Sequence, residues 1–75
     1  MSITYTKQKN SSRYFIEIDG IRIVSHICEE LNMSFEEYIN VLQMNGGLFS
    51  NKIGWYFPSE EKAFNCCVML NLLKK

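Results

Sequence analysis

The alternation of apolar and polar residues predicts strands in the first third of the chain. Ile3–Lys7 has β-type residues with modest alternation, which predicts a short edge strand. In Arg13–Ile18 every second residue is apolar, which predicts a half-buried strand with Phe15 on its outer face. Asp19-Gly20 follows, and this pair favours a two-residue turn because both positions tolerate positive φ. The chain then returns as Ile21–Val24, which completes a hairpin.

The middle of the chain has the period of two helices. Between Val24 and Leu31 the apolar residues recur at i, i+3, i+4 and i+7, as on one face of a helix. Ser34 and Glu37 form the pattern of a capping box, so we expect a second helix to begin there. Asn45-Gly46 is typical of a left-handed helix stop. The sequence therefore predicts a short helix, a tight turn and a second short helix.

The last third predicts a second hairpin in Gly47–Phe57, with a bulge or a close backbone approach at Gly54, and then a helix over Glu60–Leu73 capped by Ser59. This helix has two apolar stripes: Ala63, Cys66, Cys67, Leu70 and Leu73 in one, and Phe64, Val68 and Leu72 in the other. One stripe is enough to cover the core, so we expect the second to form a homodimer or partner interface. The alternative is that the preceding helices cover both stripes and make this the central helix.

The segment Ser25–Leu42 resembles the DNA-binding helix-turn-helix. Cys28 supplies the small residue of the first helix, Asn32 stands where the family often has glycine, and Met33 is apolar in the turn. The following hairpin takes the place of a wing, so the winged variant is the nearest family, and the resemblance implies that the second helix approaches the major groove. The charge departs from the family, because no Lys or Arg occurs between Ile23 and Asn51.

These elements predict one α+β domain over residues 1–75. Its expected order is an N-terminal β-hairpin or meander, two short helices in a helix-turn-helix-like arrangement, a second β-hairpin and a C-terminal helix. The 75 residues carry eight basic and eight acidic side chains, so the formal net charge is zero and nothing attracts nucleic acid globally. No apolar run reaches the length of a membrane span, and the first residues lack the pattern of a signal peptide. Three cysteines form no disulfide framework, so we expect a reduced, cytoplasmic setting.

Site chemistry is sparse in this sequence. His26-x-Cys28 and the adjacent pair Cys66-Cys67 do not have the spacing of metal ligands. Gly46-Gly47 is not followed by the Lys-Ser/Thr of a phosphate loop. We therefore expect no catalytic residues, no metal and no cofactor, and predict that the protein is not an enzyme.

In size and style the chain resembles the small proteins of phages and mobile elements, many of which act by occupying a host protein. This resemblance implies a non-enzymatic protein-binding module, such as an inhibitor of a host nuclease or defence protein, whose acidic segment would engage a basic surface. The same acidic residues can instead form a solvated helix face. The alternative function is a winged helix-turn-helix regulator that binds DNA. The candidate partner-binding residues are Glu29, Glu30, Glu36, Glu37, Trp55, Tyr56, Val68 and Leu72.

Overall fold

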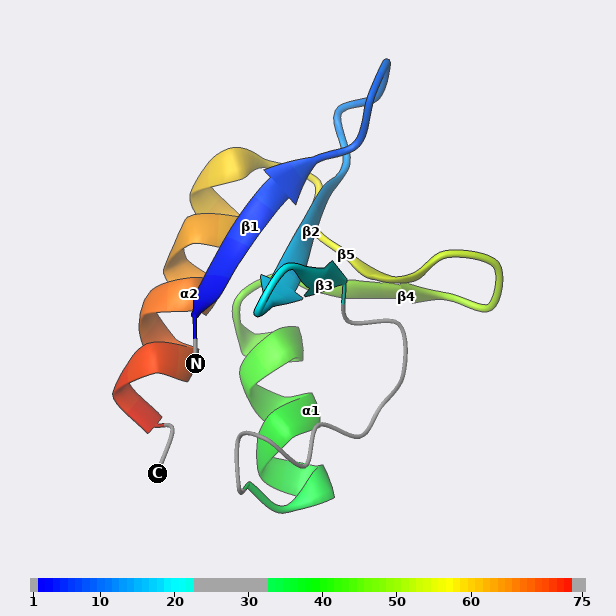
Figure 1. The fold of residues 1–75 in the computed structure, drawn as a ribbon. Coiled ribbons are helices and arrows are strands. Elements are labelled where there is room, and N and C mark those ends of the chain that lie inside the picture. The colour runs from blue at the N-terminus through cyan, green and yellow to red at the C-terminus, as the bar shows by residue number, and fades with distance from the viewer. Residues whose placement is uncertain (1, 23–32, 74–75) are drawn as a thin grey trace.

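A three-stranded antiparallel sheet opens the computed structural model, which describes residues 2–22 and 33–73, the side chain of residue 35 excepted (Figure 1). Its strands are β1 (Ile3–Lys7), β2 (Tyr14–Ile18) and β3 (Ile21–Arg22), in the spatial order β1-β2-β3. The predicted edge position of β1 is confirmed. Asp19 and Gly20 have φ of 54° and 82°, as a two-residue hairpin turn with positive φ at both positions requires.

The central strand β2 is buried on both faces, which corrects one prediction. Ile16 and Ile18 lie in the main core as expected, but Phe15 is 2% exposed although the alternation placed it outward. The guanidinium carbon of Arg22 lies over the Phe15 ring, 4.4 Å from its centroid. A cation stacked on the ring covers apolar surface that a one-faced strand would leave in water.

The second half of the described chain alternates helix and sheet: α1 (Phe35–Met44), the hairpin of β4 (Leu48–Ser50) and β5 (Gly54–Tyr56), and α2 (Glu60–Leu73). The predicted second hairpin and the last helix are confirmed. Gly54, where we expected a bulge or a close backbone approach, instead pairs with Ser50 in a regular ladder, at φ 81°. Backbone hydrogen bonds between Tyr14 and Phe57, 2.9 and 2.8 Å long, join the two sheets. The hairpin is therefore attached to the main sheet through a single β-bridge.

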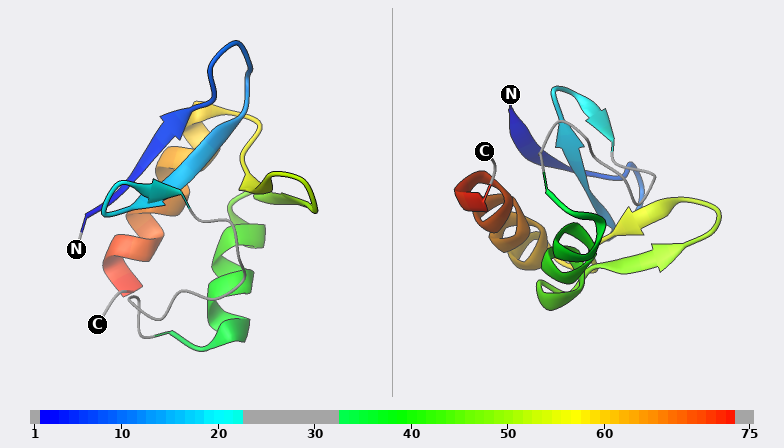
Figure 2. Two further views of the ribbon diagram at one scale, coloured as in Figure 1. Left: turned by 45° about the vertical axis from the view of Figure 1, so that its right-hand side comes forward. Right: turned by 90° about the horizontal axis from the view of Figure 1, so that it is seen from below.

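The predicted order of elements is wrong. We expected two consecutive helices between the hairpins, but across the described residues one helix lies there and the other follows β5. Three residues of α1, Tyr38, Val41 and Leu42, share one core with α2 and the sheet, so α2 packs beside α1 (Figure 2). We expected a preceding helix to cover the apolar face of α1, but this face is buried against the later helix α2. The predicted first helix, Val24–Leu31, lies outside the described residues.

Local capping sets the ends of α1 as the sequence predicts. The Ser34 hydroxyl accepts a hydrogen bond from the Glu37 amide, 3.1 Å long, and donates to the Glu37 carboxylate. At the other end Gly46 has φ 85°, and its amide donates to the carbonyl of Gln43. Gly47 passes so close to α1 that an added Cβ would lie 2.7 Å from the carbonyl oxygen of Leu42.

Candidate functional site

One side of α2 covers the main sheet and α1. Its core-facing residues are Ala63, Cys66, Cys67 and Leu70. Asn71 adds a polar contact at the edge of the sheet, because its side-chain amide donates to the carbonyl of Ile3 in β1, 3.4 Å away, and to that of Cys67. The predicted first stripe is confirmed in these four residues. Leu73, which the same stripe included, is 38% exposed instead.

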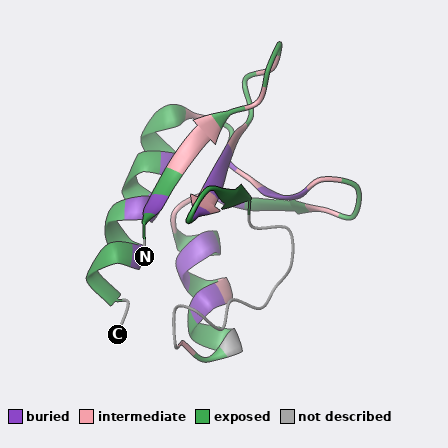
Figure 3. Cartoon of the chain, viewed as in Figure 1, coloured by how far each residue is buried: buried purple, intermediate pink, exposed green. Residues whose placement is uncertain are grey.

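Five large apolar side chains of α2 are exposed, and polar residues such as Asn65 lie between them; the exposed parts of the helix are green in Figure 3. Leu72 is 74% exposed, Phe64 52% and Val68 42%. Met69 and Leu73 are also exposed, further round the helix, and we call the five exposed apolar side chains the outer face of α2: Phe64, Val68, Met69, Leu72 and Leu73. The expectation of a solvent-facing second stripe is confirmed, and the alternative of a fully covered central helix is wrong.

Contacts on both flanks hold α2 in place. On one flank the Phe64 ring meets Tyr5 of β1 edge-on, with centroids 6.3 Å apart. On the other flank the aliphatic stem of Lys62 packs over Gly46 at the end of α1, where an added Cβ would lie 2.6 Å from Lys62 Cδ. The helix therefore contacts both β1 and α1 through side chains on its flanks.

The acidic candidates lie at the start of α1. Glu36 and Glu37 are exposed in its first turn, where the positive end of the helix dipole stabilises them. Glu37 also closes the cap with Ser34. Glu29 and Glu30 lie outside the described residues, so the structure brings together only two of the four acidic candidates.

The aromatic candidates of β5 differ in exposure. Trp55 is buried in the main core, and its ring meets Phe49 at 5.4 Å between centroids. Tyr56 is half-buried, with the Arg13 guanidinium carbon 5.5 Å from its centroid. Of this pair, only Tyr56 has surface to offer a partner.

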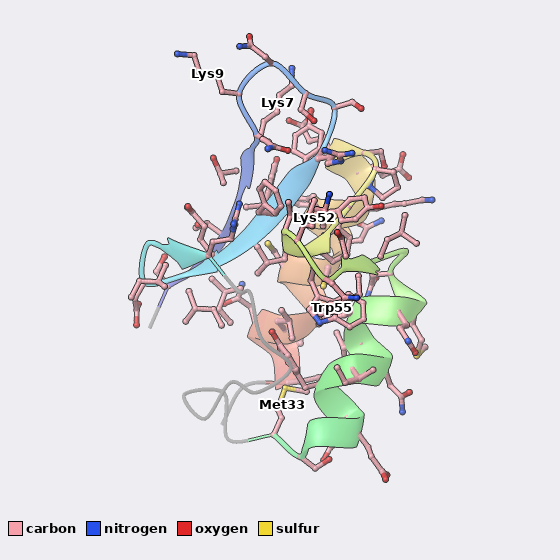
Figure 4. All side chains as sticks on the ribbon, turned by 90° about the vertical axis from the view of Figure 1, so that its right-hand side faces the viewer. Lys7, Lys9, Met33, Lys52 and Trp55 are labelled. Carbon is pink, nitrogen blue, oxygen red and sulfur yellow. The ribbon has the colours of Figure 1, made fainter. Side chains whose placement is uncertain are left out.

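Lys7, Lys9 and Lys52 lie away from the start of α1. Figure 4 shows Lys7 and Lys9 around the β1–β2 loop and Lys52 on the β4–β5 loop, whereas Met33 precedes α1 at the opposite end of the molecule. The start of α1 carries the exposed Glu36 and Glu37. A phosphate backbone would therefore meet acidic residues at the helix end that a helix-turn-helix presents to DNA.

The two described cysteines are free and buried. Burial raises the pKa of Cys66 to about 12, with a smaller contribution from Cys67, and raises the pKa of Cys67 to about 11. Such thiols stay protonated at neutral pH, and the thiolate is the form that attacks electrophiles and binds metals. Within residues 2–22 and 33–73, no three His, Cys, Asp or Glu side chains lie together as a metal site would need.

Sequence reasoning named Val68 and Leu72 as partner-binding candidates but left out their exposed neighbours Phe64, Met69 and Leu73. For Phe64 the signal was present, since it belongs to the second stripe. For Leu73 the prediction was the opposite of the observation, because its stripe was expected to cover the core. Exposure there depends on where β1 begins relative to the last turn of α2, and the periodicity within one helix carries no information on that.

Comparison with known proteins adds no relative: no protein-family model, no curated protein and no solved structure matches this chain. Among the described residues, no helix has the length and apolar character needed to cross a membrane.

Proposed function

We propose that this domain is a non-enzymatic protein-binding module that presents the outer face of α2 to its partner. The observation that carries the proposal is the concentration of five exposed large apolar side chains on one helix of 14 residues. Contiguous exposed apolar surface on a small domain marks an interaction site, because water disfavours it. The other side of α2 is packed in the core, so the helix is already formed before a partner binds, which lowers the entropy cost of binding.

The acidic first turn of α1 supports a finer version of the proposal, an inhibitor that occupies a basic surface of a nuclease or defence protein. Glu36 and Glu37 are exposed and would meet cationic side chains favourably. The same two residues weigh against the alternative, a DNA-binding regulator. A mobility-shift assay at low salt tests that alternative: tight, salt-sensitive binding of duplex DNA that is lost on Lys52→Glu would replace our proposal.

Site-specific photo-crosslinking in the producing cell tests the module directly. A benzophenone amino acid replaces Leu72, and a matched control replaces Met44, which is 82% exposed but lies at the end of α1. We expect a discrete protein adduct from position 72 and none from position 44. Equal labelling from positions 72 and 44 would refute the proposed surface. A second probe replaces Phe64, and the absence of any protein adduct from both position 72 and position 64 would refute it as well.

A further inference from the structure

We propose that the face of the sheet turned away from α2 binds single-stranded nucleic acid through arginine side chains that are stacked on aromatic rings. We call this surface the arginine face, and it consists of four side chains: Arg13, Phe15, Arg22 and Tyr56. The inference goes beyond the proposed function, because it concerns a different surface and a different class of partner.

The arginine face lies on the side of the sheet opposite to α2. Successive side chains of a strand point to opposite faces, so Phe15 points away from Ile16, which belongs to the core that α2 covers (Figure 2). An antiparallel bridge joins Tyr14 to Phe57. The next pair in that register is Phe15 and Tyr56, so both rings lie on the same face. Strand β2 and the end of β5 thereby hold two aromatic rings beside each other.

Each of these rings carries an arginine. The guanidinium carbon of Arg22 is 4.4 Å from the centroid of Phe15, and that of Arg13 is 5.5 Å from the centroid of Tyr56. Both arginines are exposed, whereas Phe15 is buried and Tyr56 is half-buried. Cation–π attraction orients each guanidinium on its ring, and its other plane and its N–H groups remain for a ligand. The surface therefore offers planar cations that are already oriented.

The charge of these arginines is not neutralised within the described part of the chain. Neither Arg13 nor Arg22 forms an ion pair with a described carboxylate. Glu17 shares the face, because it is the partner of Arg22 in the register of β2 and β3. Glu60 lies toward Tyr5, whose partner in register is Ile16, so this carboxylate is on the α2 side of the sheet. The arginine face is therefore open to an anionic ligand.

A single nucleic-acid strand matches both properties of the arginine face. Its phosphates accept hydrogen bonds from guanidinium N–H groups, and its unstacked bases pack on guanidinium planes and aromatic rings. In a duplex the bases are stacked on one another, so a duplex offers mainly phosphates. An acidic peptide offers carboxylates without a planar base. The single strand is the partner that uses the charge and the stacking together.

Fluorescence anisotropy of a labelled oligothymidylate about ten nucleotides long tests the proposal on the full chain. We expect saturable binding with a Kd of roughly 10–100 µM at about 50 mM salt, because a surface with few phosphate contacts binds weakly. Kd should rise with salt concentration. Absence of binding up to roughly 500 µM protein at this salt concentration would overturn the inference.

Neutral variants test the two cations. Arg13→Gln and Arg22→Gln should each raise Kd at least about fivefold, and each should lower the slope of log K against log salt by about 0.7. The matched control Lys52→Gln removes the same charge from an exposed residue on the β4–β5 loop, outside the arginine face, and should leave Kd within about twofold. Emission of the buried Trp55 verifies that each variant is folded. Equal weakening in all three variants would indicate diffuse attraction to positive charge and would overturn the inference.

Further variants separate stacking from charge. Arg13→Lys keeps the cation and loses the planar guanidinium, whereas Tyr56→Leu keeps the cation and removes the ring beneath it. We expect each change to raise Kd at least about threefold while the salt slope stays that of the wild type. Unchanged binding in both variants would leave charge as the sole cause and would refute the stacked geometry.

Glu17→Gln gives a test in the opposite direction. It removes the carboxylate that shares the face with Arg22 and would repel phosphates, so Kd should fall at least about twofold. Weaker binding in this variant, with Trp55 emission unchanged, would contradict a phosphate at the arginine face.

Competition identifies the class of partner. Unlabelled oligothymidylate should displace the probe at least about tenfold more effectively than duplex DNA or polyglutamate at equal concentrations of charge. Equal displacement by polyglutamate would assign the surface to acidic peptides, and equal displacement by the duplex would assign it to phosphates alone. Either result would overturn the inference.

Failure of this inference is distinguishable from failure of the proposed function. The photo-crosslinking probe at Leu72 lies on α2, on the other side of the sheet from the arginine face. A protein adduct from position 72 without oligothymidylate binding would leave the protein-binding module and remove the nucleic-acid surface. The reverse result would remove the module and leave the arginine face.

Discussion

Leu70 and Leu72 offer a matched pair of substitutions on one helix. Leu70 is fully buried, whereas Leu72 is 74% exposed. Both changes to Ala alter helix propensity equally, so their difference isolates burial. At Leu70 the loss combines transfer and cavity formation, about 2–5 kcal/mol for a core leucine. Full burial of a leucine side chain contributes roughly 1.5–3 kcal/mol. Only about a quarter of Leu72 is shielded, so its change to Ala should cost about 0.5 kcal/mol.

Urea unfolding followed by Trp55 fluorescence measures this difference. Trp55 is the sole tryptophan and is buried, so its emission reports loss of the core. A protein concentration of about 1 µM keeps self-association from contributing to the measured stability. We expect the free energy of unfolding to fall by at least about 1.5 kcal/mol more in Leu70→Ala than in Leu72→Ala.

A domain of 75 residues has roughly 4–11 kcal/mol of stability in total. Leu70→Ala can therefore leave little folded protein, and Leu70→Val, a smaller deletion, then provides the measurement. Equal losses in the Leu70 and Leu72 variants would refute the orientation of α2 described above. A larger loss at Leu72 would mean that the outer face is the buried one.

Three further predictions concern the turn, the cap and the buried thiols. Gly20→Val should lower the free energy of unfolding by 1 kcal/mol or more in urea titrations, because φ at this position is 82° and a β-branched residue resists it. Ser34→Ala should cost about 1 kcal/mol, through the lost bond to the Glu37 amide, with Ser34→Asp as the tolerated control in the same assay. Folding raises the pKa of Cys66 from 9.0 to about 12, so above pH 9 the thiol ionises in the unfolded chain before it ionises in the folded one. The free energy of unfolding should therefore fall between about pH 9 and 12, and it should fall less steeply in Cys66→Ala.

The features of this fold that depend on neighbouring residues could be predicted from the sequence. The Asp19-Gly20 turn and the cap at Ser34 each depend on residues within a few positions, and both form as predicted. The bounds of α2 are equally local, because Ser59 accepts from the Lys62 amide at its start. Propensity and capping decide such features before tertiary contacts form.

The mistaken predictions depend on contacts between one element and another. The prediction of the order of elements was wrong because the spacing of apolar residues in α1 shows only that another segment covers this helix. It does not show which segment that is. Phe15 was placed outward because alternation assumes one buried face, and Arg22 stacks on the other. The candidate site was found in part, at Val68 and Leu72, since two stripes on one helix can be counted from sequence. Which stripe the sheet covers is a property of the assembled domain.

The bond between Asn71 and Ile3 has a consequence for synthesis of the chain. It joins residues 68 positions apart, and the core-facing side of α2 packs on the same sheet. Contacts of such long sequence separation form late and slow the folding of a small domain. The first sheet emerges from the ribosome long before its cover, with Ile3, Ile16 and Ile18 exposed until α2 has been translated. Folding is therefore completed only when the last helix is free to dock, and a nascent chain stalled before Glu60 should bind chaperones that recognise apolar strands.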